Sequence, residues 1–153
     1  MAPLVVNSPQ ELKNLVGREI GVSGWFGVTQ DRILQFAEAT EDTQWIHVDA
    51  ERARKESPWG TTIAHGFLTL SLMSHLAREV LDVRGVRMRV NYGLNRVRFP
   101  AAVRADSRIR ARIALQFLKE LPDCKEATLL ITLESENSDK PCCVAEWLVR
   151  YYA

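Results

Sequence analysis

The chain has 153 residues and a formal net charge of +1, with 46% hydrophobic and 25% charged residues, so we expect a single globular domain over residues 1–153. Polar residues interrupt even the most hydrophobic segment, residues 63–81, which excludes a membrane-spanning helix there. The N-terminal sequence lacks the basic segment and long apolar core of a secretory signal peptide, so we expect a cytoplasmic protein.

The first half of the chain predicts a strand and then helical segments. Residues 20–28, IGVSGWFGV, are typical of a strand whose glycines indicate bends or bulges. Residues 29–40 predict a helix, because Thr29 can cap its start and apolar residues recur along one face. That apolar stripe is Ile33, Phe36 and Ala37. A short helical turn capped by Asp49 is expected over residues 49–56.

The most apolar segment predicts one long helix over residues 62–81, with two apolar rows at helical spacing. The first row is Ile63, Phe67, Leu70, Ser74, Ala77 and Leu81, and the second is Leu68, Leu72, Leu76 and Val80. A helix that is apolar around so much of its circumference has to be wrapped by other parts of the chain.

The second half of the chain predicts strands, which are residues 85–93, 94–103, 107–118, 127–135 and 142–152. The third strand alternates strictly between arginines and an apolar set that we expect to face inward. The inward set is Ile109, Ala111, Ile113, Leu115 and Phe117. Helices followed by an antiparallel meander predict an α+β fold in which one sheet curls around one central helix, and not a parallel α/β fold.

Asp42 and His47 lie five residues apart in the phrase EDTQWIHVDA (41–50), which connects two helical segments. A carboxylate and an imidazole brought together by a loop can hold a water molecule and move its protons, since histidine titrates near neutrality. In loops, however, aspartate and histidine more often serve as turn and capping residues. The pair alone is therefore compatible with either role.

A second phrase, TTIAHG (61–66), lies at the start of the predicted long helix. Backbone N–H groups at a helix start lack partners within the helix, and the helix dipole is positive there. Gly66 would let a ligand approach this backbone closely, which suits a carbonyl oxygen that becomes negative during a reaction. The alternative is that Gly66 only allows the helix to pack closely on the sheet. We expect the neighbouring His65 to be structural and to orient the helix start.

Three segments together resemble the motifs of the MaoC-like dehydratases, or (R)-specific enoyl-CoA hydratases, in their order and spacing. They are FAEATEDTQWIHVD (36–49), IAHG (63–66) and RVRFPAAVRADSRIRAR (96–112). The resemblance covers roughly residues 25–150. It implies a single hot dog fold, in which an antiparallel sheet wraps around a long central helix.

The resemblance also implies a set of site residues. Asp42 and His47 match the catalytic pair of the family, and Gly66 matches the glycine whose amide binds the thioester carbonyl. Ser74, two helical turns further on, matches a serine that supports the site.

Three positions depart from the family pattern. Glu41, Gln44 and Trp45 stand where the family has glycine, asparagine and proline. Gln44 could still orient the loop by hydrogen bonding, and Trp45 adds bulk that could reshape the acyl pocket. Both proton-handling side chains remain, so these changes bear on acyl-chain preference more than on the reaction.

The activity implied by the resemblance is that of an (R)-specific enoyl-CoA hydratase, which hydrates trans-2-enoyl-CoA reversibly to (R)-3-hydroxyacyl-CoA. This chemistry needs no metal and no redox cofactor. The expected partners are an acyl-CoA or acyl-carrier-protein thioester and a second copy of the chain in a homodimer, with no nucleic acid and no membrane. A heterodimer with a similar partner is the rival assembly.

Three other functions stay open on the sequence. One is a dehydratase that acts on carrier-protein thioesters or on a specialised metabolite. The second is a hot dog acyl-CoA thioesterase, which would cleave the C–S bond. The third is a non-catalytic acyl-binding subunit, although such a subunit would need neither Asp42 nor His47.

Nine arginines and one acidic residue lie between Arg84 and Arg112, a local charge of about +8 in a nearly neutral protein. Such a window favours an anionic ligand, and arginines 87, 89, 96 and 98 are candidates to contact coenzyme A phosphates or an acidic carrier protein. The other interpretation places arginines on the solvent-exposed faces of strands.

The cysteines indicate reduced thiols. Cys124, Cys142 and Cys143 are an odd number, and two of them are adjacent, which does not suit a disulfide framework. The C-x-x-C spacing of zinc sites is absent, so we expect no structural metal.

Overall fold

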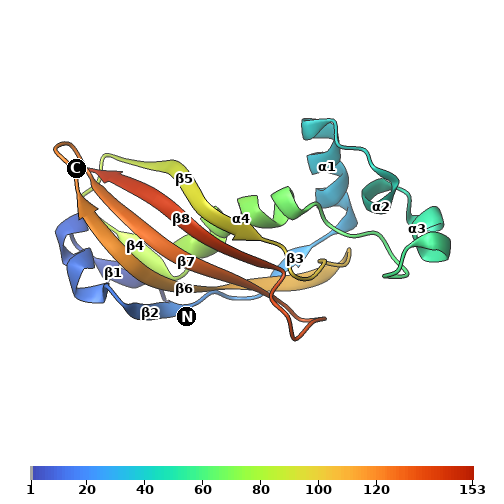
Figure 1. Cartoon of the computed structure of the whole chain (residues 1–153), viewed down its shortest axis with the longest axis horizontal. Coiled ribbons are helices and arrows are strands. Elements are labelled where there is room, and N and C mark those ends of the chain that lie inside the picture. Colours follow the sequence, from blue (N-terminus) through green and yellow to red (C-terminus); the bar gives the residue numbers. More distant parts are fainter. Residues whose placement is uncertain (1) are drawn as a thin grey trace.

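A computed structural model describes residues 2–153 and shows a curved sheet with helix α4 against one face (Figure 1). The elements in chain order are β1 (Leu4–Val6), the 3-10 helix η1 (Pro9–Leu15), β2 (Arg18–Val22), β3 (Phe26–Val28), α1 (Gln30–Thr40), α2 (Trp45–Val48), α3 (Ala50–Glu56), α4 (Gly66–Arg78), β4 (Leu81–Val83), β5 (Met88–Arg98), β6 (Ser107–Glu120), β7 (Lys125–Ser135) and β8 (Cys143–Tyr152). Helices α1, α2 and α3 extend beyond one end of the sheet.

The main sheet is antiparallel and has the order β2-β6-β7-β8-β5, with β3 pairing beside β2 along β6. The strand predicted over residues 20–28 is thus divided into β2 and β3. The two strands predicted at 85–93 and 94–103 are wrong, because the chain forms a single strand, β5, with bulges near Asn91 and Arg96. β5 lies at the edge of the sheet, and β1 and β4 form a small parallel pair.

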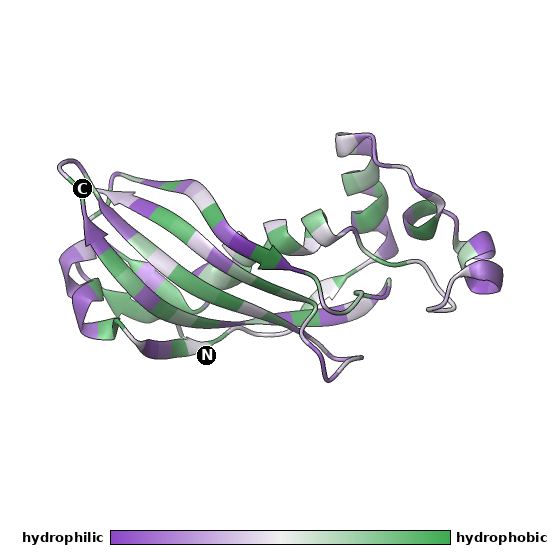
Figure 2. Ribbon diagram, viewed as in Figure 1, coloured by the Kyte–Doolittle hydropathy of each residue, from purple (hydrophilic) through white to green (hydrophobic). Residues whose placement is uncertain are grey.

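Hydrophobic and hydrophilic residues alternate along the strands of the sheet (Figure 2), and in β6 the buried positions alternate in the same way. Ile109, Ala111, Ile113 and Leu115 are fully buried, which confirms their predicted orientation. Phe117 was expected to follow them but is 66% exposed. A bulge between Leu115 and Phe117 adds one residue to β6 and reverses the side chains beyond it.

The central helix is shorter than the predicted segment 62–81, because α4 begins at Gly66 and ends at Arg78. The residues before it are held in extended form: the Ala64 N–H bonds to the Val103 carbonyl at 2.8 Å, and Ile63 pairs with Arg104. The second predicted apolar row is buried in the core. The first row is not uniformly buried, since Phe67 is 70% exposed.

The caps predicted for two of the helices beyond the sheet are confirmed. The Thr29 hydroxyl accepts a hydrogen bond from the Arg32 N–H at 3.2 Å, and the Asp49 carboxylate accepts one from the Arg52 N–H at 2.9 Å. Across residues 2–153 no helix is long and apolar enough to cross a membrane.

Candidate active site

His47 is buried on the short helix α2, where its ring is held in one orientation. The Nδ1 atom lies 2.7 Å from the Ile63 carbonyl oxygen. Because a carbonyl oxygen only accepts hydrogen bonds, we assign the ring proton to Nδ1. The neutral ring then carries a free lone pair on Nε2, which is the atom that can take a proton from a ligand.

His65 joins the two predicted catalytic residues. Its ring stacks on that of His47 with 3.8 Å between ring centroids, and its Nε2 atom donates to the Asp42 backbone carbonyl at 2.9 Å. One ligand-type side-chain atom from each of Asp42, His47 and His65 lies within 4.8 Å of the others. The structure therefore brings Asp42 and His47 together, and gives His65 a larger positioning role than orienting the helix start.

Asp42, His47 and His65 offer the ligand types that a transition metal prefers. They form the only group of three such side chains found among residues 2–153. A carboxylate and a neutral imidazole are also sufficient for acid–base chemistry on water, which requires no metal.

Gln30 connects the segments that carry His47 and Gly66, and sequence reasoning missed it. Its Nε2 atom donates to the His47 carbonyl at 2.9 Å, and its Oε1 atom accepts from the Thr62 hydroxyl. Its backbone N–H donates to the Asp106 carboxylate at 3.0 Å. Gln30 thus links α1 to α2, to the segment before α4 and to the turn before β6.

Gln44 was expected to orient the loop through its side chain. It is exposed at the start of α2, and no side-chain hydrogen bond from it is found within residues 2–153. Only its carbonyl helps, by accepting from the His47 N–H at 2.9 Å. Trp45 is not among the residues of the cleft and instead packs under the Arg52 guanidinium, 4.3 Å from its ring centroid.

His47 and Gly66 line a cleft of about 560 Å³ at the start of α4. Other residues of the cleft include Trp59, Thr69, Phe99, Arg104 and Cys142. The N–H of Gly66 lies in the first turn of α4, where it has no partner within the helix and where the dipole is positive. Two residues of the cleft lining therefore carry a proton acceptor, in His47, and an N–H group without a helical partner, in Gly66.

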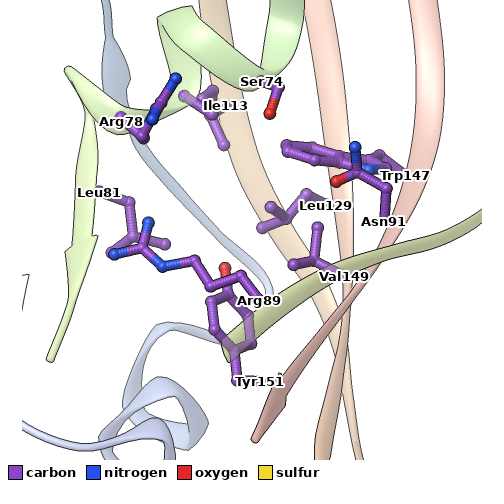
Figure 3. Close-up of a pocket in the computed structure, with 11 residues that line it drawn as sticks. Ser74, Arg78, Leu81, Arg89, Asn91, Ile113, Leu129, Trp147, Val149 and Tyr151 are labelled. Carbon is purple, nitrogen blue, oxygen red and sulfur yellow. The ribbon is translucent and has the colours of Figure 1, made fainter. Parts of the chain in front are cut away.

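Ser74 does not reach this cleft within one subunit. It lies eight residues after Gly66 on α4, which is about 12 Å along the helix axis. It lines a second cavity of about 410 Å³ between α4 and the sheet, which Figure 3 shows.

The arginine window divides into two groups. Arginines 84, 89, 108, 110 and 112 pair with carboxylates. Arginines 87, 96, 98 and 104 have no carboxylate partner in the part of the chain that the structure describes, and Arg104 lies in the cleft lining. The interpretation as solvent-facing strand residues thus fits the paired group, and the unpaired group is available to an anion.

The environment of His47 lowers its pKa below the ordinary value of 6.5. Burial is the largest cause, because it disfavours the charged ring, and the neighbouring His65 acts in the same direction. The hydrogen bond to Ile63 and the charge of Asp42 oppose the shift. The ring is therefore neutral at pH 7 and ready to accept a proton.

This shift predicts the pH dependence of activity. If neutral His47 is the base, kcat/KM rises with pH through a pKa below 6.5 and is level near pH 7. Below pH 6.5 the unfolded chain takes up the His47 proton before the folded chain, so stability is also lost as the pH falls toward the folded-state pKa. Measurements of kcat/KM and of urea unfolding between pH 5 and 8 test the predicted changes in activity and in stability. An activity midpoint above 6.5 contradicts the assignment.

Glu41, immediately before Asp42, caps the end of α1 in the left-handed conformation, with φ 62° and ψ 16°. A residue with a side chain is strained there by about 1–2 kcal/mol, whereas glycine is not. We expect Glu41→Gly to raise the free energy of unfolding by about 1 kcal/mol, measured by urea denaturation. Thr40→Gly is the matched control and should destabilise, because Thr40 lies within α1. Equal effects of the two changes would contradict this account.

The antiparallel sheet around a central helix defines the hot dog fold, and two solved structures share it. The monoamine oxidase regulatory protein of Archaeoglobus fulgidus has a TM-score of 0.77 and 21% identity, covering 100% of this chain and 99% of that chain. The (R)-hydratase PhaJ1 of Pseudomonas aeruginosa has a TM-score of 0.71 and 20% identity, covering 90% and 81%. At these identities the likeness establishes the fold alone.

The family follows from sequence. The MaoC like domain model matches residues 11–134. A relative in Mycobacterium tuberculosis, 3-hydroxyacyl-thioester dehydratase Z, is 48% identical over 147 residues, covering 95% of this chain and 97% of the relative. The chain belongs to the MaoC-like domain family, and it is a hydro-lyase, an enzyme that adds or removes water.

Proposed function

We propose that this chain catalyses the reversible hydration of trans-2-enoyl-CoA to (R)-3-hydroxyacyl-CoA. The observation that supports this most is the convergence of Asp42 and His47 near a cleft that also contains the N-terminal turn of α4. The relative in Mycobacterium tuberculosis is named as a dehydratase of 3-hydroxyacyl thioesters, the reverse direction of the same reaction.

In this proposal the proton acceptor is Nε2 of His47. Water is a poor nucleophile, so Asp42 holds it by accepting one hydrogen bond while His47 removes a proton as the oxygen adds to C3. The imidazolium then returns the proton to C2 on the same face. Water is thus added across the double bond without any other reactant. General acid–base catalysis of this kind contributes about 10²–10⁴-fold.

The thioester oxygen gains negative charge as the nucleophile adds. In this proposal it accepts a hydrogen bond from the N–H of Gly66, at the positive end of α4. A single donor of this type is worth on the order of 3 kcal/mol of transition-state stabilisation. The carrier end of the substrate then lies toward Arg104 and the unpaired arginines of β5, whose charge suits the phosphates of coenzyme A.

We also propose a homodimer that pairs through β5. This strand is at the sheet edge, and the apolar side chains Met88, Tyr92 and Leu94 on it are 45%, 55% and 40% exposed. An unpaired apolar edge favours association with another strand, which a second copy can supply. Sedimentation velocity would give the mass of the particle, and a monomer at micromolar concentration would exclude this dimer.

The activity is tested with trans-2-enoyl-CoA thioesters from C4 to C16. The proposal expects loss of enoyl absorbance without release of free thiol, and a product of R configuration. Release of thiol would instead identify a thioesterase, and binding without either change would identify a non-catalytic subunit. The same chains on an acyl carrier protein distinguish the two carriers by kcat/KM.

A further inference from the structure

The cavity that contains Ser74 is separate from the cleft of His47 and Gly66 and has a different chemical character. It lies between the second half of α4 and the concave face of the sheet, with β5 along one side (Figure 3). The residues that line it are Ser74, Ala77, Arg78, Leu81, Arg89, Asn91, Ile113, Leu129, Trp147, Val149 and Tyr151. At about 410 Å³ it has room for roughly a dozen non-hydrogen atoms.

One buried polar group in the cavity lining lacks a partner. Trp147 is only 5% exposed, and its indole Nε1–H makes no hydrogen bond with any of residues 2–153. Leaving such a donor unpaired in the interior costs about as much as a lost hydrogen bond, so native structures rarely tolerate it without a ligand or water. Ser74 and Asn91 lie close to the indole in the cavity view, which makes this end of the cavity polar.

The opposite end of the cavity is positively charged. Arg78 has no carboxylate partner in the described part of the chain, and Arg89 shares Asp82 with Arg84, at 3.6 Å from Arg89 to the Asp82 carboxylate. Tyr151 lies beside Arg89, and burial raises the pKa of its hydroxyl to about 12. The phenol therefore stays a neutral donor. Asp82 is shared between Arg84 and Arg89 at this end, and Arg78 adds a positive charge that no carboxylate in the described residues pairs.

Between these two ends the lining is apolar. Ile113, Leu129 and Val149 come from the neighbouring strands β6, β7 and β8, and Ala77 of α4 also lines the cavity. A ligand that suits the apolar middle and the positive end of the cavity has an apolar body and an anionic head. Guanidinium groups bind carboxylates with short, charge-assisted hydrogen bonds, so a carboxylate is the head that suits Arg78 and Arg89.

We propose that this cavity binds the far end of the acyl chain and that Arg78 and Arg89 select chains whose far end carries a carboxylate. This inference rests on the proposed function, because it assigns the cavity to the same thioester substrate. Helix α4 supplies residues to both places, Gly66 to the cleft and Ser74 to the cavity. The carboxylate replaces the water that otherwise has to satisfy the guanidinium groups, and the indole lies at the opposite end of the cavity.

The test compares two series of trans-2-enoyl-CoA thioesters from 6 to 16 carbons, one with a terminal methyl and one with a terminal carboxylate. We expect kcat/KM to favour the carboxylated chain by about tenfold or more at one or more lengths. Arg78→Met and Arg89→Met should reduce this ratio toward one. Arg18→Met, on the opposite edge strand β2, is the matched control and should keep the wild-type ratio.

A ratio at or below one at every length overturns the inference, as does a ratio that the two cavity variants leave unchanged. If kcat/KM falls equally for both series in Arg78→Met and Arg89→Met, these arginines support the fold or the dimer and do not select a carboxylate. That result also overturns the inference. If neither series is turned over, the proposed function fails, and direct binding then decides on the cavity. Octanoate should bind more tightly than octanol by calorimetry and should lose this advantage in Arg78→Met. Equal affinities would refute a carboxylate site.

Discussion

Replacing His47 by Gln is expected to lower kcat/KM for enoyl-CoA hydration by about 10²–10⁴-fold while the chain still folds. The Gln amide can donate to the Ile63 carbonyl in place of Nδ1, which preserves the buried contact. It cannot act as a base, because an amide does not take up a proton near neutral pH. Asp42→Asn should cause a loss of similar size, since it removes the carboxylate that holds water in the proposed mechanism.

Two matched controls separate this loss from a general effect. His75→Gln changes a histidine on the exposed side of α4 that does not line the cleft. Asp49→Asn changes the cap of α3, where asparagine caps as well as aspartate. Both controls should retain near-wild-type kcat/KM. If His47→Gln and Asp42→Asn also keep near-wild-type turnover, neither residue is catalytic.

The parts of the fold that local sequence determines were predicted correctly. The helix at 30–40 and the helical turn at 50–56 have their caps and stripes within their own segments. The buried face of β6 follows from its alternation as far as Leu115. The bulge that exposes Phe117 arises in the pairing of β6 with β7. The sequence of β6 alone does not indicate this bulge.

The start of α4 is a second feature that the local sequence could not predict. Residues 62–65 have the apolar spacing of a helix, but the hydrogen bond from Ala64 to Val103 holds them in extended form. Val103 lies 39 positions further along the chain. Only a tertiary contact could therefore place the first helical turn at Gly66, which lines the cleft.

Motif and spacing were sufficient to predict that Asp42 and His47 lie close together, but not the long-range contacts around them. Asp42 and His47 are near in sequence, and the structure brings them together. Gln30 was missed because its partners, His47 and Thr62, are 17 and 32 positions away. Arg104 was not among the arginines predicted to contact an anion, which were 87, 89, 96 and 98, because only the turn after β5 places it in the cleft.

Gly66→Ala is the second change for which we expect a large effect, on the order of 10²-fold in kcat. A Cβ atom at this position would lie 3.1 Å from the ring of Phe99, which itself lines the cleft. Phe99 is 40% exposed, so its ring can move, and the free energy of unfolding should change little. The activity should suffer more, because relief of this contact displaces the backbone N–H or pushes the ring into the cleft.

The double variant Gly66→Ala/Phe99→Ala decides between these two causes. Removing the ring gives the added methyl group space, so activity above that of Gly66→Ala alone would show that the contact with Phe99 causes the loss. Phe99→Ala alone supplies the reference, because it measures what the ring contributes to substrate binding. An unchanged kcat in the Gly66→Ala enzyme would show that the N–H tolerates a side chain, and the carbonyl oxygen would then have to be stabilised by another donor of the cleft.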